Sequence, residues 1–221
     1  MRAEPSCPRC AAVLRPPGLW SSAWLCDAHG QVAPVQPAVQ PTPEVLNAAA
    51  AAARVPLWVP WPLPRGWLVT GVLVAGDDRT GARATALACS GPSPTGGVAE
   101  LVVVAEEMGV GLGARFAGLD GPDGGTAPDR AVDAKIHAAG IPTAMWEVAP
   151  GPAAQDRAVY VGEALHCWLW AVLWPGTAGF LLIDDFVLVD LRDAGHDLDL
   201  PCGALSPRLL SPGPSSPGPI A

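Results

Sequence analysis

Charged residues are scarce in this chain of 221 residues. They make up 15% of it, and the basic ones are rarer, with 13 Lys and Arg against 21 Asp and Glu. The resulting net charge of −8 repels nucleic-acid phosphates and anionic lipids unless the basic residues gather on one face. The composition therefore argues against a nucleic-acid-binding protein.

Uninterrupted apolar runs of membrane-spanning length are also missing. The most apolar stretch, residues 164–183, is about as long as a membrane helix, but Pro175, Gly176 and Gly179 interrupt it near its middle. This interruption favours two buried strands around a turn over a membrane span. The first residues show neither the apolar run nor the small-residue cleavage site of a secretory signal, so we expect a cytoplasmic protein.

Phe and Tyr are rare, at 3 and 1, and nine Trp serve as the main aromatic residues. Hydrophobic residues reach 50%, which is enough for a packed core despite 25 Gly and 26 Pro. The length allows one domain of ordinary size plus a small appendage. Of six cysteines, three belong to a cluster described below, and the odd remainder of three widely spaced ones predicts free thiols in a reducing compartment.

Shifts in composition divide the chain into four parts. Residues 1–33 are rich in cysteine, and residues 34–54 form a linker that begins with four prolines and passes into an alanine run. Thr42 as N-cap and Glu44 in the first turn predict a short helix over that run. Residues 55–210 form the main domain, and the Pro-rich tail, residues 211–221, is predicted to be disordered.

The main domain contains short apolar segments separated by Gly, Pro and Asp, which is typical of an antiparallel sheet. We predict an α+β fold in which a zinc ribbon precedes a predominantly antiparallel sheet with one to three helices. Residues 133–139 could be a helix packed on the sheet, and residues 184–193 could be helix or strand. The predicted strands are residues 67–75, 84–90, 99–105, 143–148, 158–161, 167–174 and 180–183.

One predicted strand is apolar on both faces. In residues 168–174, a period of two places the three tryptophans and Val172 on one face, and Leu169, Ala171 and Leu173 on the other. A strand of this kind is expected in the centre of a sheet that is covered on both sides.

Two pairs of metal-ligand residue types lie near the N-terminus. Cys7 and Cys10 are separated by two residues, fifteen residues follow, and Cys26 and His29 repeat the same spacing. Two tight turns of this kind can aim four side chains at one ion, and a Cys3His set suits tetrahedral zinc. The alternative is four unrelated thiol and imidazole groups at the surface. Four protein ligands close the coordination shell, so the expected zinc is structural and not catalytic.

The predicted zinc ribbon lacks the cluster of basic residues that is typical of nucleic-acid binding. Its arginines, Arg2, Arg9 and Arg15, oppose Glu4 and Asp27, which leaves a net charge of +1 over residues 1–33. Trp20 and Trp24 beside the second ligand pair are therefore interpreted as a packing or docking face and not as base-stacking platforms.

Two patterns in the main domain point weakly towards chemistry. Residues 109–115 are glycine-rich and follow a predicted strand, but they lack the full dinucleotide-binding spacing, and Glu106 and Glu107 would repel a pyrophosphate. Aspartates at residues 77–78, 184–185 and 190–199 could supply acid/base or hard-metal chemistry, or could act in turns and caps. No nucleophile elbow or HExxH helix accompanies them.

Prolines alternate with tryptophans in residues 55–67, which disfavours a central strand. Trp58, Trp61 and Trp67 must either cap the core or stand exposed as a partner surface, and we favour capping.

Seven segments of the chain together resemble an uncharacterised, zinc-ribbon-containing protein family from high-GC Gram-positive bacteria. The resemblance covers nearly the whole chain except the tail, and it implies no activity, because that family has no assigned function or catalytic residues. A second resemblance is confined to residues 63–67, which are similar to the strand entry of sheet domains in envelope-stress regulators. Those proteins are usually secreted, so their function is not transferred. The segments of the first resemblance are residues 4–10, 61–67, 76–79, 88–92, 109–115, 190–195 and 201–210.

The sequence favours a zinc-binding, non-catalytic binding or regulatory module that engages a protein partner or a small ligand. Two alternatives stay open. One is an enzyme that uses the aspartate clusters for metal-assisted or acid/base chemistry, and the other is a structural oligomeric scaffold.

Overall fold

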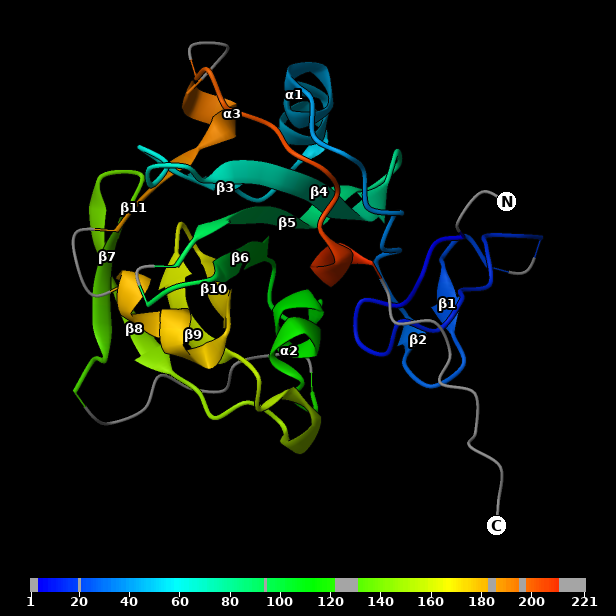
Figure 1. The fold of residues 1–221 in the computed structure, drawn as a ribbon. Helices are drawn as coiled ribbons and strands as arrows, with labels where there is room; N and C mark the ends of the chain where they lie inside the picture. Colours follow the sequence, from blue (N-terminus) through cyan, green and yellow to red (C-terminus); the bar gives the residue numbers. More distant parts are fainter. Residues whose placement is uncertain are drawn as a thin grey trace.

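The computed structural model describes residues 4–19, 21–93, 95–121, 131–182, 186–194 and 198–210. The predicted disordered tail, Trp20 and the aspartates at 184 and 185 lie outside these residues. The described chain is mostly β with few helices. A small N-terminal module, with the two-stranded hairpin β1 (Leu25–Cys26) and β2 (Gly30–Gln31), lies beside a large curled sheet (Figure 1).

The large sheet has nine strands in the order β3-β11-β7-β8-β9-β10-β6-β5-β4. It is a mixed sheet, because β11 and β7 pair in parallel while the other neighbours are antiparallel, so the antiparallel prediction holds only in part. The strands are β3 (Trp58–Pro60), β4 (Leu68–Asp77), β5 (Gly81–Pro92), β6 (Val98–Glu106), β7 (Ala134–Ala138), β8 (Ile141–Glu147), β9 (Ala158–Ala164), β10 (Cys167–Trp174) and β11 (Val187–Asp190).

Strand β10 lies inside the sheet, between β9 and β6, and is covered on both faces as predicted. Leu169, Ala171 and Leu173 belong to one apolar cluster, and Trp170 and Val172 belong to a second cluster on the opposite face. Each of these side chains is at most 1% exposed. Burial of both faces explains why the strand has no polar alternation.

Two local predictions need correction. Residues 133–139 are not a helix but contain β7, because buried Ala134, Ile136 and Ala138 alternate with more exposed neighbours. Positive φ angles at Ala139 and Gly140 then form the tight turn to β8. Of the predicted strand 180–183, residue 183 lies outside the described residues, and residues 180–182 are not a strand but belong to the 3-10 helix η2 (Gly176–Leu182), which follows β10. The sequence allows helix or strand over residues 184–193, and the described part, residues 186–193, contains β11 and most of the short helix α3 (Leu191–Ala194).

The linker and the last described residues cover the outer edge of β4. Val35 and Val39 form antiparallel bridges to Ala75 and Val72, and Cys202 forms a parallel bridge to Val69. The linker then enters α1 (Pro43–Ala52), whose N-cap Thr42 accepts a hydrogen bond from the Val45 backbone N–H. None of the described helices is both long and apolar enough to cross a membrane.

The tryptophans of the Pro-rich segment mostly face inward. Trp58 is 1% exposed and Trp67 is 3% exposed, whereas Trp61 is half-buried. Both buried side chains belong to the larger apolar cluster, so a partner could reach neither of them without opening the core. Of the three residues considered for a partner surface, only Trp61 keeps surface area. Strand β3 is an edge strand of the sheet. Proline is tolerated there because the hydrogen bonds of the central strands do not depend on it.

Helix α2 (Leu112–Ala117) packs directly on β10 through Gly113. A methyl group at position 113 would overlap the Trp170 indole, which is fully buried and has no free space to move into. Gly113 therefore sets the distance between the helix and the sheet.

Replacing Gly113 with Ala should destabilise the protein by about 1–3 kcal/mol, because overlap in a packed core outweighs the better helix propensity of alanine. Urea unfolding followed by tryptophan fluorescence measures this change. Gly18→Ala is the control, because a methyl group there meets nothing within 4 Å. Equal stability of the two variants would contradict the packing argument.

Candidate metal centre and the cavity beside it

Two tight turns present the four predicted ligands. In the first, the Cys7 carbonyl accepts from the Ala11 N–H at 2.9 Å, and the Cys7 N–H donates to the Ala12 carbonyl at 2.8 Å. In the second, the β1–β2 hairpin carries Cys26, and Gly30 pairs with it at a φ of 68°. The positive φ explains the glycine directly after the second ligand pair.

The ligand atoms have the spacing of a tetrahedral site. All four lie within 4.8 Å of one another. Cys10 Sγ and Cys26 Sγ are 3.7 Å apart, and His29 Nδ1 is 3.5 Å from Cys7 Sγ and 3.6 Å from Cys26 Sγ. Bonds of about 2.3 Å to sulfur and about 2.0–2.1 Å to nitrogen give tetrahedral edges of about 3.8 Å and 3.6 Å. Cys7, Cys10, Cys26 and His29 could therefore hold one metal ion.

The thiols differ in their readiness to lose a proton. Burial raises the pKa of Cys7 to about 12. Burial also acts to raise the pKa of Cys26, but the Ala28 backbone N–H and the His29 side chain outweigh it and lower that pKa to about 7. A bound cation is the agent that would hold Cys7 as a thiolate, because metal binding displaces the thiol proton.

Apolar burial cannot stabilise this module alone. Among the described residues, its own cluster has only Cys7, Leu14 and Cys26 as buried members, with Trp24 and Val32 packed against them. This places Trp24 in the packing role predicted for it. A core of three small or medium side chains is far below what an independent fold requires.

Two arginines join the module to α2 in opposite directions. Arg9, inside the first turn, donates from Nε to the Val110 carbonyl at 3.3 Å and from its Nη2 to the Gly109 carbonyl. Arg115, on α2, donates from Nη1 to the Cys7 carbonyl at 3.3 Å. Burial lowers the pKa of Arg115, while the sulfurs of Cys7 and Cys10 oppose that shift. The metal-ligand turn is thus attached to the sheet domain on both sides.

A protein carboxylate occupies the start of α2. If residues 109–115 bound a dinucleotide, a hypothesis that the sequence argues against, its phosphate would lie at this position. Glu106 is fully buried, and its Oε2 and Oε1 accept from the Leu112 N–H at 2.6 Å and the Gly113 N–H at 3.1 Å. The backbone donors of residues 112 and 113 are therefore already used. Burial raises the pKa of Glu106 to about 7, although these two N–H groups act to lower it.

The aspartates considered for chemistry do not come together in the described residues, where the four Cys and His side chains are the sole metal-ligand cluster. Asp77 accepts from the Thr80 N–H and hydroxyl within its own turn. Asp190 is buried, pairs with Arg192 at 2.7 Å and accepts from the Leu57 N–H. Asp184, Asp185 and Asp197 lie outside the described residues.

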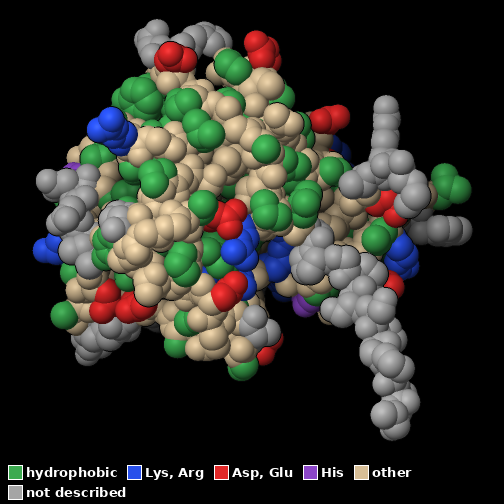
Figure 2. Space-filling model, viewed as in Figure 1, with side chains coloured by type: hydrophobic (Ala, Val, Ile, Leu, Met, Phe, Trp, Pro, Cys, Tyr) green, Lys and Arg blue, Asp and Glu red, His purple; other side chains and the backbone are tan. Residues whose placement is uncertain are grey.

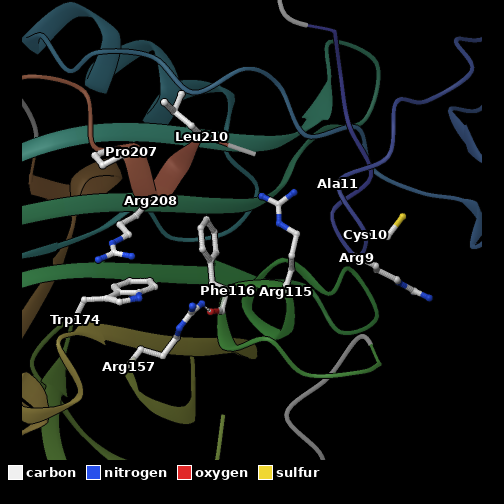
Figure 3. A pocket seen from close by; sticks show the side chains of 10 residues that line it. All are labelled: Arg9, Cys10, Ala11, Arg115, Phe116, Arg157, Trp174, Pro207, Arg208 and Leu210. Carbon is white, nitrogen blue, oxygen red and sulfur yellow. Dashed lines mark hydrogen bonds between the residues drawn. The ribbon is translucent and has the colours of Figure 1, made fainter. Parts of the chain in front are cut away.

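A cavity of about 480 Å³ opens where the module meets the sheet domain. Sequence reasoning missed it, because the arginines that line it are spread over the chain at positions 9, 115, 157 and 208 and form no local motif. The lining residues are Arg9, Cys10, Ala11, Arg115, Phe116, Arg157, Trp174, Pro207, Arg208 and Leu210 (Figure 3).

Fold and site together define a mixed-sheet protein with an N-terminal Cys3His cluster docked on it. The chain belongs to a family of unknown function, DUF6758, whose model matches residues 1–209. No curated protein and no solved structure matches the chain.

The buried Glu106 predicts a pH dependence of stability. Because folding raises its pKa from 4.5 to about 7, the carboxyl favours the folded state below pH ~4.5 and loses that contribution as the pH rises through ~7. Relative to Glu106→Gln, the wild-type free energy of unfolding should fall by about 3 kcal/mol across this window.

Urea unfolding at several pH values measures the difference, and Glu163→Gln, at an exposed position, is the control. A pH-independent difference between wild type and Glu106→Gln would show that residue 106 does not titrate in this range.

Proposed function

We propose that this protein is a non-catalytic binding module of regulatory type, whose N-terminal segment folds around one structural Zn²⁺ ion. The observation that carries the proposal is the tetrahedral spacing of three sulfurs and one imidazole nitrogen within 4.8 Å. Sulfur-rich donor sets with one histidine are typical of structural zinc. Four protein ligands leave no coordination position for an activated water or a substrate.

Docking supports a structural role for the ion. Arg9 and Arg115 bind backbone carbonyls across the boundary, and both contacts require the first turn to keep its shape. With a buried cluster of three residues, that shape depends on coordination, which contributes about 10–16 kcal/mol in structural zinc sites. The ion thereby fixes one wall of the cavity, through Arg9, Cys10 and Ala11. A cavity with a metal-fixed wall favours a small ligand as the binding partner.

The purified chain should contain one zinc ion per molecule, measured by elemental analysis. Cys26→Ser should lose it, because the serine hydroxyl is a poor zinc ligand at neutral pH. Cys202→Ser is the matched control, since Cys202 is a free thiol outside the cluster. Full zinc content in Cys26→Ser would refute the site, and so would a wild-type protein that takes up none when zinc is supplied.

Removing the ion with a chelator should unfold the module and leave the sheet intact. Hydrogen exchange measures this. The Ala11 and Leu14 amides, which are hydrogen-bonded within the module, should lose protection, while those of β10 should keep it. Protection of Ala11 that survives complete zinc loss would show that packing alone holds the turn.

A further inference from the structure

The cavity between the module and the sheet is strongly basic in an otherwise acidic protein. Four of its ten lining residues are arginines, none is Asp or Glu, and the chain as a whole carries −8. Figure 2 shows Lys and Arg side chains in the hollow between the main body and the module, with acidic side chains beside them. Such segregation is the condition under which an acidic protein can attract an anion.

The arginines come from separate elements that converge on one space. Arg115 lies on α2, Arg157 precedes β9, and Arg208 lies on the 3-10 helix η4 (Pro207–Leu209). Figure 3 shows these three side chains around Phe116 and Trp174, with Arg9 extending away on the far side of the first turn. Arg9 thus lines the cavity from its docked position on the Gly109 and Val110 carbonyls, and the other three arginines lie around Phe116 and Trp174.

Two of the three guanidinium groups are held in place before any ligand binds. Arg157 and Arg208 lie 5.0 Å and 4.8 Å from the centre of the Trp174 ring. Arg208 also donates from Nε to Glu100 at 2.7 Å, and Arg157 donates to Asp156 at 2.8 Å and to the Phe116 carbonyl at 2.7 Å. Stacking and ion pairing lower the entropy cost of binding an anion.

Ion pairing does not exhaust the positive charge. Arg115 and Arg9 have no carboxylate partner among the described residues. Glu100 pairs with Arg208 at 2.7 Å, and Asp156 pairs with Arg157 at 2.8 Å and more loosely with Arg208 at 3.6 Å. All four lining arginines, Arg9 included, must be counted against these two carboxylates and the net −1 of a Zn(Cys)3His centre, and one positive charge then remains. Each guanidinium also has five N–H donors, and the hydrogen bonds of Arg115, Arg157 and Arg208 to the described residues use only some of them.

We propose that this cavity binds a small molecule that carries a phosphate group on an apolar body. One guanidinium satisfies the two oxygens of a carboxylate, but three guanidinium groups from different directions suit an anion with three oxygens and nearly two charges. Phe116, Trp174, Pro207 and Leu210 supply apolar walls for the remainder of the ligand. The net charge of −8 disfavours a long polyanion.

This proposal rests on the proposed function, because the zinc-bound turn forms one wall of the site. Titration calorimetry on the full chain at low ionic strength tests it with phenyl phosphate, inorganic phosphate, benzoate and a short single-stranded oligonucleotide. Phenyl phosphate should bind at one site per chain, more tightly than either phosphate or benzoate. No saturable binding, or tighter binding of benzoate or the oligonucleotide, would overturn the proposal.

Arg208→Gln and Arg157→Gln should each weaken phenyl phosphate by about tenfold or more, because each removes charge-assisted hydrogen bonds. Arg65→Gln, at an exposed position away from the cavity, should change the affinity less than about twofold. Unchanged zinc content and circular dichroism show that the variants fold. Equal loss in all three variants, or no loss in the two cavity variants, would overturn the site.

The same preparations separate the two proposals. A protein that takes up no zinc when zinc is supplied, yet binds phenyl phosphate through Arg208, would refute the metal assignment and support the cavity. A zinc-loaded protein that binds no phenyl phosphate would refute the cavity and leave the metal assignment intact.

Discussion

Two guanidinium groups that cross the same boundary in opposite directions join the two parts of this protein. Arg9 reaches from the first metal-ligand turn to the carbonyls before α2, and Arg115 reaches from α2 to the Cys7 carbonyl. Backbone carbonyls are fixed acceptors, so these contacts form only if both the turn and the helix start are rigid. In the proposed function, metal coordination would make the turn rigid, and the Glu106 carboxylate together with the Gly113–Trp170 packing fixes the helix.

Local patterns in the sequence predicted the parts of the fold that local physics controls. The apolar faces of residues 168–174 predicted a central strand, and the paired spacing of Cys7, Cys10, Cys26 and His29 predicted a cluster that the structure does bring together. Residues 133–139 were predicted as a helix because their short apolar period was ambiguous. These residues form a strand because β11 and β8 pair with β7 on either side. A single sequence does not show which segments will pair.

The cavity lay beyond sequence reasoning for a different reason. Its arginines are separated by roughly forty to a hundred residues, and only the docking of the module and the end of the sheet bring them together. The net charge of the whole chain argued against anionic ligands, because 21 acidic residues outnumber 13 basic ones. The field at a binding site depends on the groups within roughly a Debye length, so a local excess of one sign can oppose the average.

The two segments that lie along β4 have a consequence for self-association. Residues 34–39 hydrogen-bond to Val72, Val74 and Gly76, and residues 201–206 hydrogen-bond to Val69 and Thr70 on the same edge. An uncovered, long, apolar edge strand is a template for adding strands from other molecules. The two extensions act as permanent edge protection, so shortening the chain to its central sheet would create an aggregation-prone fragment.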